Sequence, residues 1–547
     1  MKNLSKWWKS GSPWIWLNAG AVAISMVTVI ALLSLILVRG LGHFWAADIV
    51  EVVYQGEGGS QKIIGELIRK EQVDLKSLGA EASEINNGER WLLKTGNREI
   101  SADFRWIEQA NVVSVSKPKE LVVLERSEWG AFYGYLISVS EKGKLVAKGE
   151  NAWSEFSQRV ERVASLRKKV RQLERVEMGA INYQLEKLRL KRKKLEIDKA
   201  DTPTALEKIQ LEERRLGEEF DVYMADLRAL NQEIERDSAV FQVMNGQEVS
   251  ISFAHVIEGL RPNSMGYAQK ITNYISTFVG FLKDDPREAN TEGGVFPAIF
   301  GTVVMVLIMS IIVTPFGVVA AVYLREYASQ GIVTKVVRIA VNNLAGVPSI
   351  VYGVFGLGFF VYFLGGTLDS LFYPEYAPAP YLGTSGLMWA SLTLALLTLP
   401  VVIVSTEEGL TRIPRNLREG SLALGATKAE TLWKVVLPMA SPSIMTGLIL
   451  AVARAAGEVA PLMLVGVVKL APELPLDGNF PYLHIERKFM HLGFHIYDVG
   501  FQSPNVEAAQ PLVYATAFLL VLIIVILNLS AILLRNRLRE KYRGVTG

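Results

Sequence analysis

The sequence contains no cysteine, and only five of its 547 residues are histidine. A chain without cysteine forms neither a disulfide framework nor a thiolate nucleophile, although its compartment stays undecided. The sequence also lacks the G-x-x-x-x-G-K-[ST] phosphate loop, so the chain cannot hydrolyse ATP by that route. It shows no recognisable set of nucleophile, base and orienting group, which makes an enzyme the least favoured class.

The chain also has no large excess of positive or negative charge. The formal net charge is +3, and the basic residues are spread along the chain, which does not favour nucleic acid binding. Half of the residues are hydrophobic and the mean hydropathy is +0.24, too apolar for an ordinary soluble enzyme. These values indicate a membrane protein.

Several runs are long enough to cross a bilayer, which takes about 20 mostly apolar residues. The first run exceeds the roughly 7–15 apolar residues of a cleavable signal, so we expect it to remain as an anchor. We therefore predict an α-helical polytopic membrane protein with six transmembrane helices. The predicted spans are Trp14–Val38, Val295–Leu324, Val337–Leu364, Thr384–Ser405, Ser443–Val467 and Pro511–Leu534.

Lysines and arginines near the ends of these runs predict the orientation. Lys2, Lys6 and Lys9 precede the first run, and five basic residues between Arg535 and Arg543 follow the last. With six spans, both termini are expected in the cytoplasm together with the segment 407–434. Residues 40–290 are then expected on the opposite side of the membrane.

Changes of pattern divide the chain into parts. Alternating apolar and polar residues, as in Glu120–Ser140, predict short strands, and a later three-and-four spacing of apolar residues predicts helices. Because strand-like residues return at Glu248–Phe253, we expect the helical hairpin to interrupt the β-domain. The predicted parts are the N-terminus and first span (1–39), a β-rich domain (40–150), a coiled-coil hairpin (151–238), a return strand and linker (239–291) and the remaining spans (292–547).

The expected hairpin has charged arms with apolar seams. Val163, Leu166 and Val170 lie in the first seam, and a second seam runs from Leu206 to Ile234. At this length each arm would reach on the order of 50–60 Å. A spacer that packs on itself is the simpler interpretation and a docking arm for a soluble partner is the alternative, because the pattern shows pairing but not its partner.

A charged segment, Arg418–Pro438, stands between the fourth and fifth runs. Gly425 suits the left-handed position that ends a helix, and Thr427 with Glu430 forms a T-x-x-E capping box that starts another. Pro438 limits the second helix. The segment therefore predicts a stiff helix–turn–helix element and not a flexible loop.

This segment resembles the EAA loop of ABC-transporter permeases, the cytoplasmic element that fits a groove on the ATP-hydrolysing subunit. We assign the loop to residues 405–438. The chain departs from the usual pattern at Gly420 and Ser421, where alanines are common, but small residues remain. The resemblance implies a coupling role for Glu419, Gly420, Ser421, Gly425, Thr427, Glu430, Val435, Leu437 and Pro438.

Residues 292–540 are similar to the PstA-like permeases of the phosphate-specific ABC importer. The large insert is an addition that compact members lack. The resemblance implies a type I ABC importer permease fold and a subunit of a phosphate importer in a bacterial inner membrane, with residues 40–290 in the periplasm. The matching stretches are Glu292–Thr302, Asn342–Leu357, the EAA loop, Ala453–Leu464 and Phe489–Asn505.

The same resemblance implies the partners. These are a homologous phosphate permease subunit (PstC-like), two copies of a cytoplasmic ATPase (PstB-like), a periplasmic phosphate-binding protein (PstS-like), inorganic phosphate and the lipid bilayer. ATP and Mg²⁺ would be used by the ATPase, and no cofactor is expected on this chain. Two alternatives stay open: a permease for another oxyanion such as molybdate, sulfate or phosphonate, and a membrane-anchored sensor or scaffold that acts through the insert.

Arg454 and Glu458 lie within an otherwise apolar run. A charge inside a membrane is costly, so such residues usually pair or line a polar path. Their spacing of four places them on one helix face, where they form either a structural ion pair or part of the translocation pathway. The resemblance favours the pathway, because permeases of this family carry Arg and Glu at matching places.

The histidines give no clear metal site. His491 and His495 have the i, i+4 spacing that a metal could use. No third ligand stands out near them, and His484 lies in the same loop. We expect a packed loop and no metal.

Overall fold

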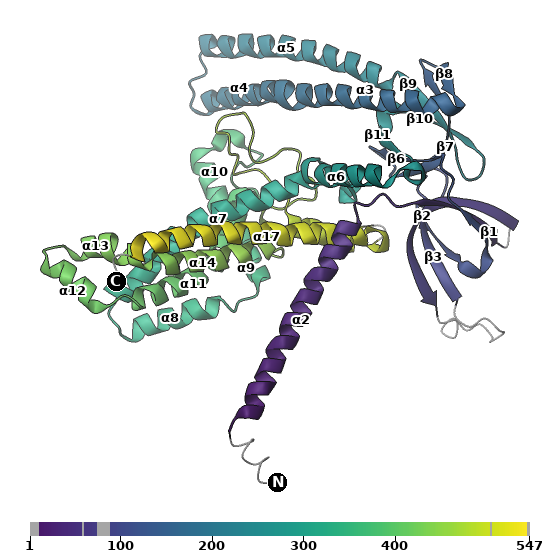
Figure 1. Cartoon of the computed structure of the whole chain (residues 1–547). Coiled ribbons are helices and arrows are strands. Elements are labelled where there is room, and N and C mark those ends of the chain that lie inside the picture. The colour runs from purple at the N-terminus through teal and green to yellow at the C-terminus, as the bar shows by residue number, and fades with distance from the viewer. Residues whose placement is uncertain (1–9, 57–58, 74–87, 504–505, 544–547) are drawn as a thin grey trace, which may run out of the picture.

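The structure is a computed structural model that describes residues 10–56, 59–73, 88–503 and 506–543. Figure 1 shows a bundle of long helices with α12, α13 and the C-terminus at one end and the β-sheets at the other. We call the first the helical end and the second, where α2 ends and α7 and α17 begin, the sheet end. The basic residues Lys2, Lys6 and Lys9, used to predict orientation, lie outside the described residues.

Six helices among the described residues are long and apolar enough to cross a membrane, which confirms the predicted number. The α2 helix diverges from the bundle in Figure 1, and its most apolar part is wholly exposed. The spans are α2 (Ser12–Gly42), α7 (Phe296–Val322), the continuous helix of α9 (Ser349–Phe355), η9 (Gly356–Gly365) and α10 (Gly366–Phe372), α11 (Leu387–Thr411), α14 (Leu437–Gly457) and α17 (Val506–Arg543).

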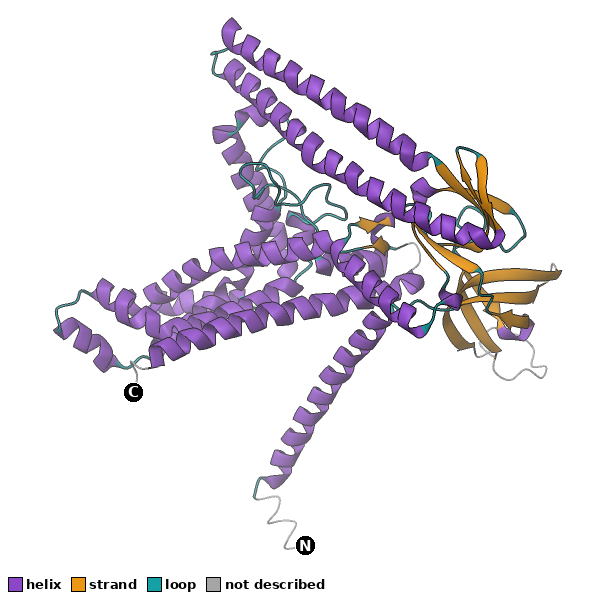
Figure 2. Ribbon diagram, turned by 45° about the horizontal axis from the view of Figure 1, so that its top comes forward, coloured by secondary structure: helices purple, strands orange, loops and turns teal. Residues whose placement is uncertain are grey.

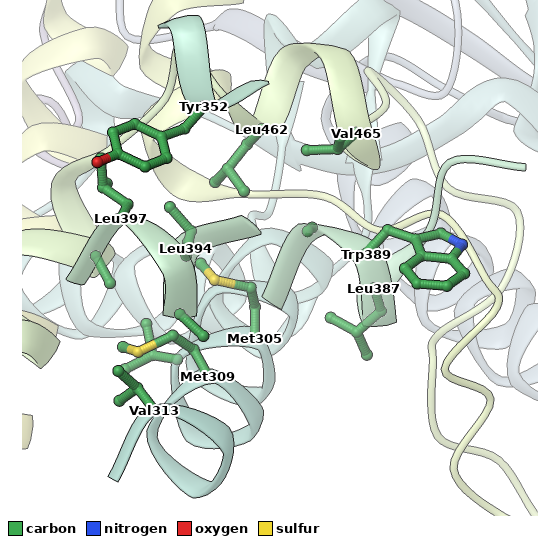
Figure 3. Packing of buried hydrophobic residues seen from close by; sticks show 14 of the residues in the cluster. Met305, Met309, Val313, Tyr352, Leu387, Trp389, Leu394, Leu397, Leu462 and Val465 are labelled. Carbon is green, nitrogen blue, oxygen red and sulfur yellow. The ribbon is translucent and has the colours of Figure 1, made fainter. Parts of the chain in front are cut away.

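The α11 helix is the centre of the bundle. Figure 3 shows Met305 and Met309 of α7 beside Leu394 of α11, within a cluster of buried side chains that also includes Tyr352, Leu462 and Val465. A Cβ atom on Gly317 of α7 would lie 2.6 Å from Cγ1 of Val402 on α11. This glycine therefore permits close packing of the two helices, in the way that small residues do at membrane helix interfaces.

The third predicted span begins too early. Residues 332–344 form a separate helix, α8 (Ile332–Leu344), and the membrane-type helix starts only at Ser349. Val347 precedes Pro348, a position where proline disfavours the α-helical region, and Pro348 itself is extended. The proline therefore separates two helices and does not kink one. Several apolar side chains of α8 are exposed, namely Ile332, Val333, Val336, Val337 and Ile339.

The fifth predicted span is displaced in the other direction. Its helix, α14, starts at Leu437 and ends at Gly457, and Glu458 has an extended backbone. The chain resumes as a single turn, α15 (Leu462–Val465), after Pro461. Proline cannot continue the hydrogen-bonding of the preceding helix, so the apolar run is divided into two pieces.

The insert contains two antiparallel sheets. The first has strand order β4-β3-β2-β1-β5, and the second has order β10-β9-β7-β6-β11 with β8 paired to β7. The strands are β1 (Ile49–Gly56), β2 (Gly59–Val73), β3 (Gly88–Lys94), β4 (Phe104–Glu108), β5 (Val112–Ser116), β6 (Leu121–Arg126), β7 (Phe132–Glu141), β8 (Lys144–Lys148), β9 (Asp237–Gln242), β10 (Glu248–Ser252) and β11 (Val256–Leu260).

A helical hairpin separates β8 from β9. Its first arm comprises α3 (Ala152–Gln172), a π-helical stretch η4 (Leu173–Met178) and α4 (Gly179–Ile197), and its second arm is α5 (Pro203–Glu235). Because β9 pairs with β7, the hairpin interrupts one sheet, as the return of strand-like residues predicts. Figure 2 shows both arms running from the sheets back along one side of the bundle, with the far part of the hairpin near α10.

The amphipathic helix α6 (Tyr267–Lys283) connects the second sheet to the bundle. Its inner side packs against the end of α2, where Phe44 contacts the rings of Tyr274 and Phe278 at centroid distances of 6.2 and 5.1 Å. Ile271 and Ile275, beside these rings on the same apolar side of α6, are exposed. The α6 helix thus joins the first span to the permease-like bundle at the sheet end.

A buried carboxylate fixes the base of the hairpin. Asp237, at the start of β9, is fully buried, and its oxygens lie 2.8 Å from Arg162, 3.4 Å from Arg159 and 2.9 Å from Arg236. Burial alone would raise the pKa of Asp237, but the hydrogen bond from Arg236 and the charges of the two α3 arginines outweigh it and lower the pKa. Asp237 thereby ties both arms to the sheet.

We expect Asp237→Ala to destabilise the hairpin base by roughly 3–5 kcal/mol, because it leaves three arginines around an empty, buried position. Amide hydrogen exchange of β7 and β9 in the full chain measures this loss. Because the folded-state pKa is lowered, the contribution of Asp237 is complete at neutral pH and is lost as the pH falls through that pKa. Asp221→Ala on the exposed side of α5 is the control, and an equal effect of both variants would contradict the assignment.

Candidate functional site

The helix–turn–helix element of residues 415–438 projects from the helical end of the bundle. The α12 helix (Arg415–Ala423) is followed by Gly425, which has the left-handed φ of 89°. The α13 helix (Lys428–Thr431) then starts with the predicted capping box, in which Thr427 N donates to Glu430 Oε2 at 3.0 Å and Glu430 N donates to Thr427 Oγ1 at 3.3 Å. The hydrogen bonds that the backbone N–H and the hydroxyl of Thr427 donate to the Glu430 carboxylate hold the pKa of Glu430 below its usual value.

One hydroxyl pair joins the two helices of the element. Ser421 Oγ lies 2.9 Å from Thr431 Oγ1, and Ala426 N donates to Ser421 O at 3.2 Å across the turn. A larger residue at position 421 would lose this contact. The small, polar character of Ser421, a departure from the family pattern, therefore has a structural use here.

An ion pair fastens the element to the second span. Arg418 lies 3.0 Å from Glu326 Oε1 in η8 (Tyr323–Tyr327), the continuation of α7, and it also donates to Leu410 O of α11 at 2.7 Å. Lys428 donates to Glu326 O and stands over the ring of Tyr327 at 4.5 Å. Both halves of the element thus contact the same end of α7.

The base of the element is a hydrophobic cluster. Leu432 and Val436, in the π-helical stretch η11 (Leu432–Val436) that leads into α14, pack with Leu324 of η8 and Leu410 of α11. Three spans therefore meet under the element. Since packed side chains resist deformation, a displacement of the element is passed to α7, α11 and α14 together.

The element exposes several apolar side chains. Leu424 in the turn is 91% exposed, Trp433 in η11 is 74% exposed, and Leu422 near the end of α12 is also exposed. Exposed aromatic and aliphatic side chains of this size commonly mark contact surfaces. The sequence analysis gave no role to Trp433, whose only signal was a tryptophan within a charged segment.

The remaining predicted coupling residues take different positions. Glu419 and Gly420 are exposed on α12, and Glu419 forms no ion pair with any residue that the structure describes. Val435 is half-buried at the base, and Leu437 and Pro438 begin α14. The structure thus brings all of the predicted residues into one element, with some supporting it and others presented to a partner.

Arg454 and Glu458 lie where α14 breaks. Arg454 is in the last turn of the helix and Glu458 follows its end, with Arg454 Nε 3.5 Å from Glu458 Oε1. Their side chains are 32% and 22% exposed, so neither is sealed in the core. The negative end of the helix dipole stabilises a cation in this last turn. The pair therefore remains open to solvent or to a neighbouring chain.

His484 and His491 have different hydrogen-bond partners. His484 lies 3.0 Å from Asp477 and 3.2 Å from Glu486, whereas His491 accepts from Gly493 N at 3.1 Å. Burial lowers the pKa of His491 to about 3 and that of His495 to about 4. In the part of the chain that the structure describes, no three ligand-type side chains gather as a metal site.

The hairpin contacts loops of the bundle. The Tyr183 hydroxyl of α4 donates to Phe480 O, Lys193 donates to Ala377 O, and Lys187 lies 5.8 Å from the ring of Phe480. In the middle of the first arm, Arg175 of η4 pairs with Asp285 at 2.6 Å. Neither of the two sequence-based interpretations anticipated this contact, in which the hairpin packs on another part of the same chain.

Comparison with known proteins gives matches to membrane transport components. A family model described as "Binding-protein-dependent transport system inner membrane component" matches residues 313–543. Over 192 residues the chain is 40% identical to the phosphate transport system permease protein PstA of Mycobacterium leprae (strain TN), a match that covers 35% of this chain and 57% of that protein. This chain is therefore similar to a permease over its helical bundle, which contains the 415–438 element and the Arg454–Glu458 pair.

Two further relatives are also named as permease proteins. Over 247 residues the chain is 34% identical to the phosphate transport system permease protein PstA 1 of Mycobacterium tuberculosis (strain CDC 1551 / Oshkosh), which covers 44% of this chain and 71% of that protein. It is 33% identical over 202 residues to the probable ABC transporter permease protein YqgH of Bacillus subtilis (strain 168), which covers 37% of this chain and 61% of that protein. The chain thus spans about three fifths of YqgH and of the M. leprae protein.

A solved structure is also similar. One chain of the MetNI methionine ABC transporter in an inward-facing conformation is 20% identical, with a TM-score of 0.33. The match covers 44% of this chain and 94% of that chain.

Two glycines of the element should respond oppositely to alanine. Gly425→Ala is expected to destabilise the turn by about 1 kcal/mol, because an L-residue is strained at its positive φ. Gly420→Ala, in the interior of α12, is expected to stabilise the helix by about 0.5–1 kcal/mol. A Cβ atom at either position meets nothing within 4 Å, so packing does not confuse the comparison. Amide hydrogen exchange over residues 415–431 measures both, and shifts of the same sign would contradict this assignment of the turn.

Proposed function

Because the chain belongs to the family of binding-protein-dependent transport system inner membrane components, the permeases of ABC transporters, we propose that it is the transmembrane permease subunit of an ATP-driven phosphate importer. Its six candidate membrane helices agree with the type I importer permease fold that the sequence resemblance implies. The substrate follows from the relatives named for phosphate transport, which the chain matches in part of its length.

The anchored element of residues 415–438 is the observation that carries this proposal. A cytoplasmic ATPase, present in two copies, would bind the exposed side chains of Leu424 and Trp433, with Glu419 at the side of the contact. The ATPase would bind ATP and Mg²⁺, since this chain has no phosphate loop. A rigid element based on three spans can pass a nucleotide-driven motion into the bundle, whereas a flexible loop would absorb it.

The distribution of basic residues supports a cytoplasmic location for the helical end. Arg412 and Arg415 lie beside the element, Lys335 lies on α8, and Arg535 and Arg537 lie toward the end of α17. Figure 1 places all of these segments at the same end. By the positive-inside rule, the termini are then cytoplasmic and residues 40–290 lie in the periplasm of a bacterial inner membrane.

A second, homologous permease would complete the pathway. The α2 helix and one side of α9 expose apolar side chains that include Ile350, Val351 and Val354. Lipid covers part of such surfaces, and a partner permease would cover the part around the break in α14. Arg454 would then face the enclosed pathway, where a guanidinium is well suited to hold phosphate oxygens, and Glu458 would neutralise it when no anion is present.

Transport by this arrangement is alternating access, in which the ATPase cycle exchanges inward- and outward-facing states. A periplasmic phosphate-binding protein would deliver the anion at the sheet end. The hairpin starts near that end and contacts the loops around Ala377 and Phe480, so it would form one border of the delivery surface.

Reversal of the charge at Glu419 tests the docking role. Glu419→Lys is expected to lower the recovery of the ATPase with the affinity-tagged permease by at least about tenfold, which corresponds to about 1.4 kcal/mol at one contact. The matched control is Glu207→Lys, an exposed reversal on the hairpin. Equal recovery of the ATPase with both variants would count against the assignment of this element.

Anion uptake tests the substrate and the role of Arg454. We expect the assembled importer in vesicles to take up labelled phosphate, with competition by unlabelled phosphate but not by equal molybdate or sulfate. Arg454→Gln should reduce uptake at least about 100-fold while ATPase recovery stays unchanged, because loss of a buried charge-assisted contact costs about 3 kcal/mol. Arg214→Gln on the hairpin is the control. Competition by sulfate or molybdate would overturn the choice of phosphate.

A further inference from the structure

A large cavity lies at the sheet end, at the junction of the insert with the bundle. Its volume is about 1090 Å³, at the upper end of the roughly 300–1,000 Å³ of ordinary ligand pockets. The ends of α2, α6 and α17 form one side, and strands of both β-sheets form the other. The lining residues used below are Val38, Phe44, Glu66, Lys94, Glu292 and Leu512.

The position of the cavity relative to the spans places it at the membrane surface. The membrane-type part of α2 ends at Gly42, and that of α17 begins at Ala509, so both helices cross the boundary of the hydrocarbon layer beside the cavity. The Trp45 ring lies 5.8 Å from Tyr267 and 6.2 Å from Tyr274, next to the exposed apolar side of α6. Tryptophan and tyrosine are enriched at this level of a bilayer.

The two sides of the cavity differ in character. Val38, Phe44 and Leu512 are apolar and lie toward the spans. Charged residues lie on the sheet side, where Lys94 of β3 is paired in register with Glu66 of β2, and Glu292 approaches from the segment before α7. The cavity thus has an apolar side continuous with the membrane and a charged side away from it.

The charged groups lack protein partners. Within the residues that the structure describes, Lys94, Glu66 and Glu292 form no ion pair or side-chain hydrogen bond, and Glu292 Oε2 is buried without any partner. Burial raises the pKa of both carboxyl groups, and the charge of Lys94 only partly opposes this. Unpaired buried charges are costly, so a ligand that pairs with them would stabilise the site.

We propose that this cavity binds a zwitterionic amino-phosphate group, supplied by the headgroup of an aminophospholipid such as phosphatidylethanolamine. Its phosphate would pair with Lys94, and its primary ammonium, with three N–H donors, would donate to Glu66 and Glu292. The acyl chains would leave along the apolar side beside α2. Phosphatidylcholine has no N–H donor, and phosphatidylglycerol has no cationic group. Neither headgroup can therefore pair with Lys94 and also donate hydrogen bonds to Glu66 and Glu292.

Retention of lipid by the full chain tests this site. The protein is equilibrated in vesicles of equal phosphatidylethanolamine, phosphatidylcholine and phosphatidylglycerol, extracted gently and examined by native mass spectrometry. We expect phosphatidylethanolamine to be retained about tenfold over each competitor, as one charge-assisted hydrogen bond provides. Glu292→Gln and Lys94→Met should each remove this preference. Glu150→Gln and Lys144→Met, which change exposed residues of the other sheet region, should keep it.

Several outcomes would overturn the proposal. Equal retention of the three lipids would do so, as would an unchanged preference in both cavity variants with wild-type melting temperatures. Displacement of the bound lipid by an equimolar amount of soluble phosphoethanolamine would show that the acyl chains contribute nothing, and would reject the membrane as the source. The test is independent of transport, because the cavity lies at the opposite end from the 415–438 element.

Discussion

The structure of the bundle depends on how the helix–turn–helix element of residues 415–438 is attached to three of the spans. Arg418 holds the element to Glu326 at the end of α7, and Leu432 and Val436 bury its base between α7, α11 and α14. The ion pair is largely shielded from solvent, with exposed fractions of 21% for Arg418 and 11% for Glu326, so breaking it would leave a poorly solvated charge without its partner. The buried cluster and the ion pair together attach the element to the end of the second span.

Under the proposed coupling, the break in α14 would pass a displacement of the element to a charged site. The helix runs without interruption from the buried base at Val436 to Gly457, with Arg454 in its last turn. A rigid helix transmits a displacement along its whole length, so Arg454 would move with the element. Beyond Gly457 the chain is extended and Glu458 belongs to a different segment, which packs through Pro461 against Gly353. The two charges therefore lie on opposite sides of the helix end, where a displacement of α14 would change the distance between them.

Local patterns predicted much of this arrangement, and they failed where prolines divide apolar runs. The capping box at Thr427 and the left-handed Gly425 depend only on neighbouring residues, so they were predictable. The third and fifth spans were misplaced because hydropathy does not distinguish one helix from two separated by Pro348 or Pro461. The anchoring of Arg418 by Glu326 joins residues 92 positions apart, and no periodicity of one segment carries that information. Trp433 was missed because an exposed tryptophan and a buried one give the same local signal.

The hairpin and the membrane anchor make the insert part of the permease and not a tethered domain. Asp237 fixes the hairpin to its sheet, and Tyr183 and Lys193 fix its far part to loops that follow α10 and α15. Phe44 packs the end of α2 against α6 on the opposite side. An insert held at two separated places cannot rotate freely, so a rearrangement of those loops would either carry the hairpin with it or break its contacts. Binding of another protein to the hairpin would therefore act directly on the loops that follow α10 and α15.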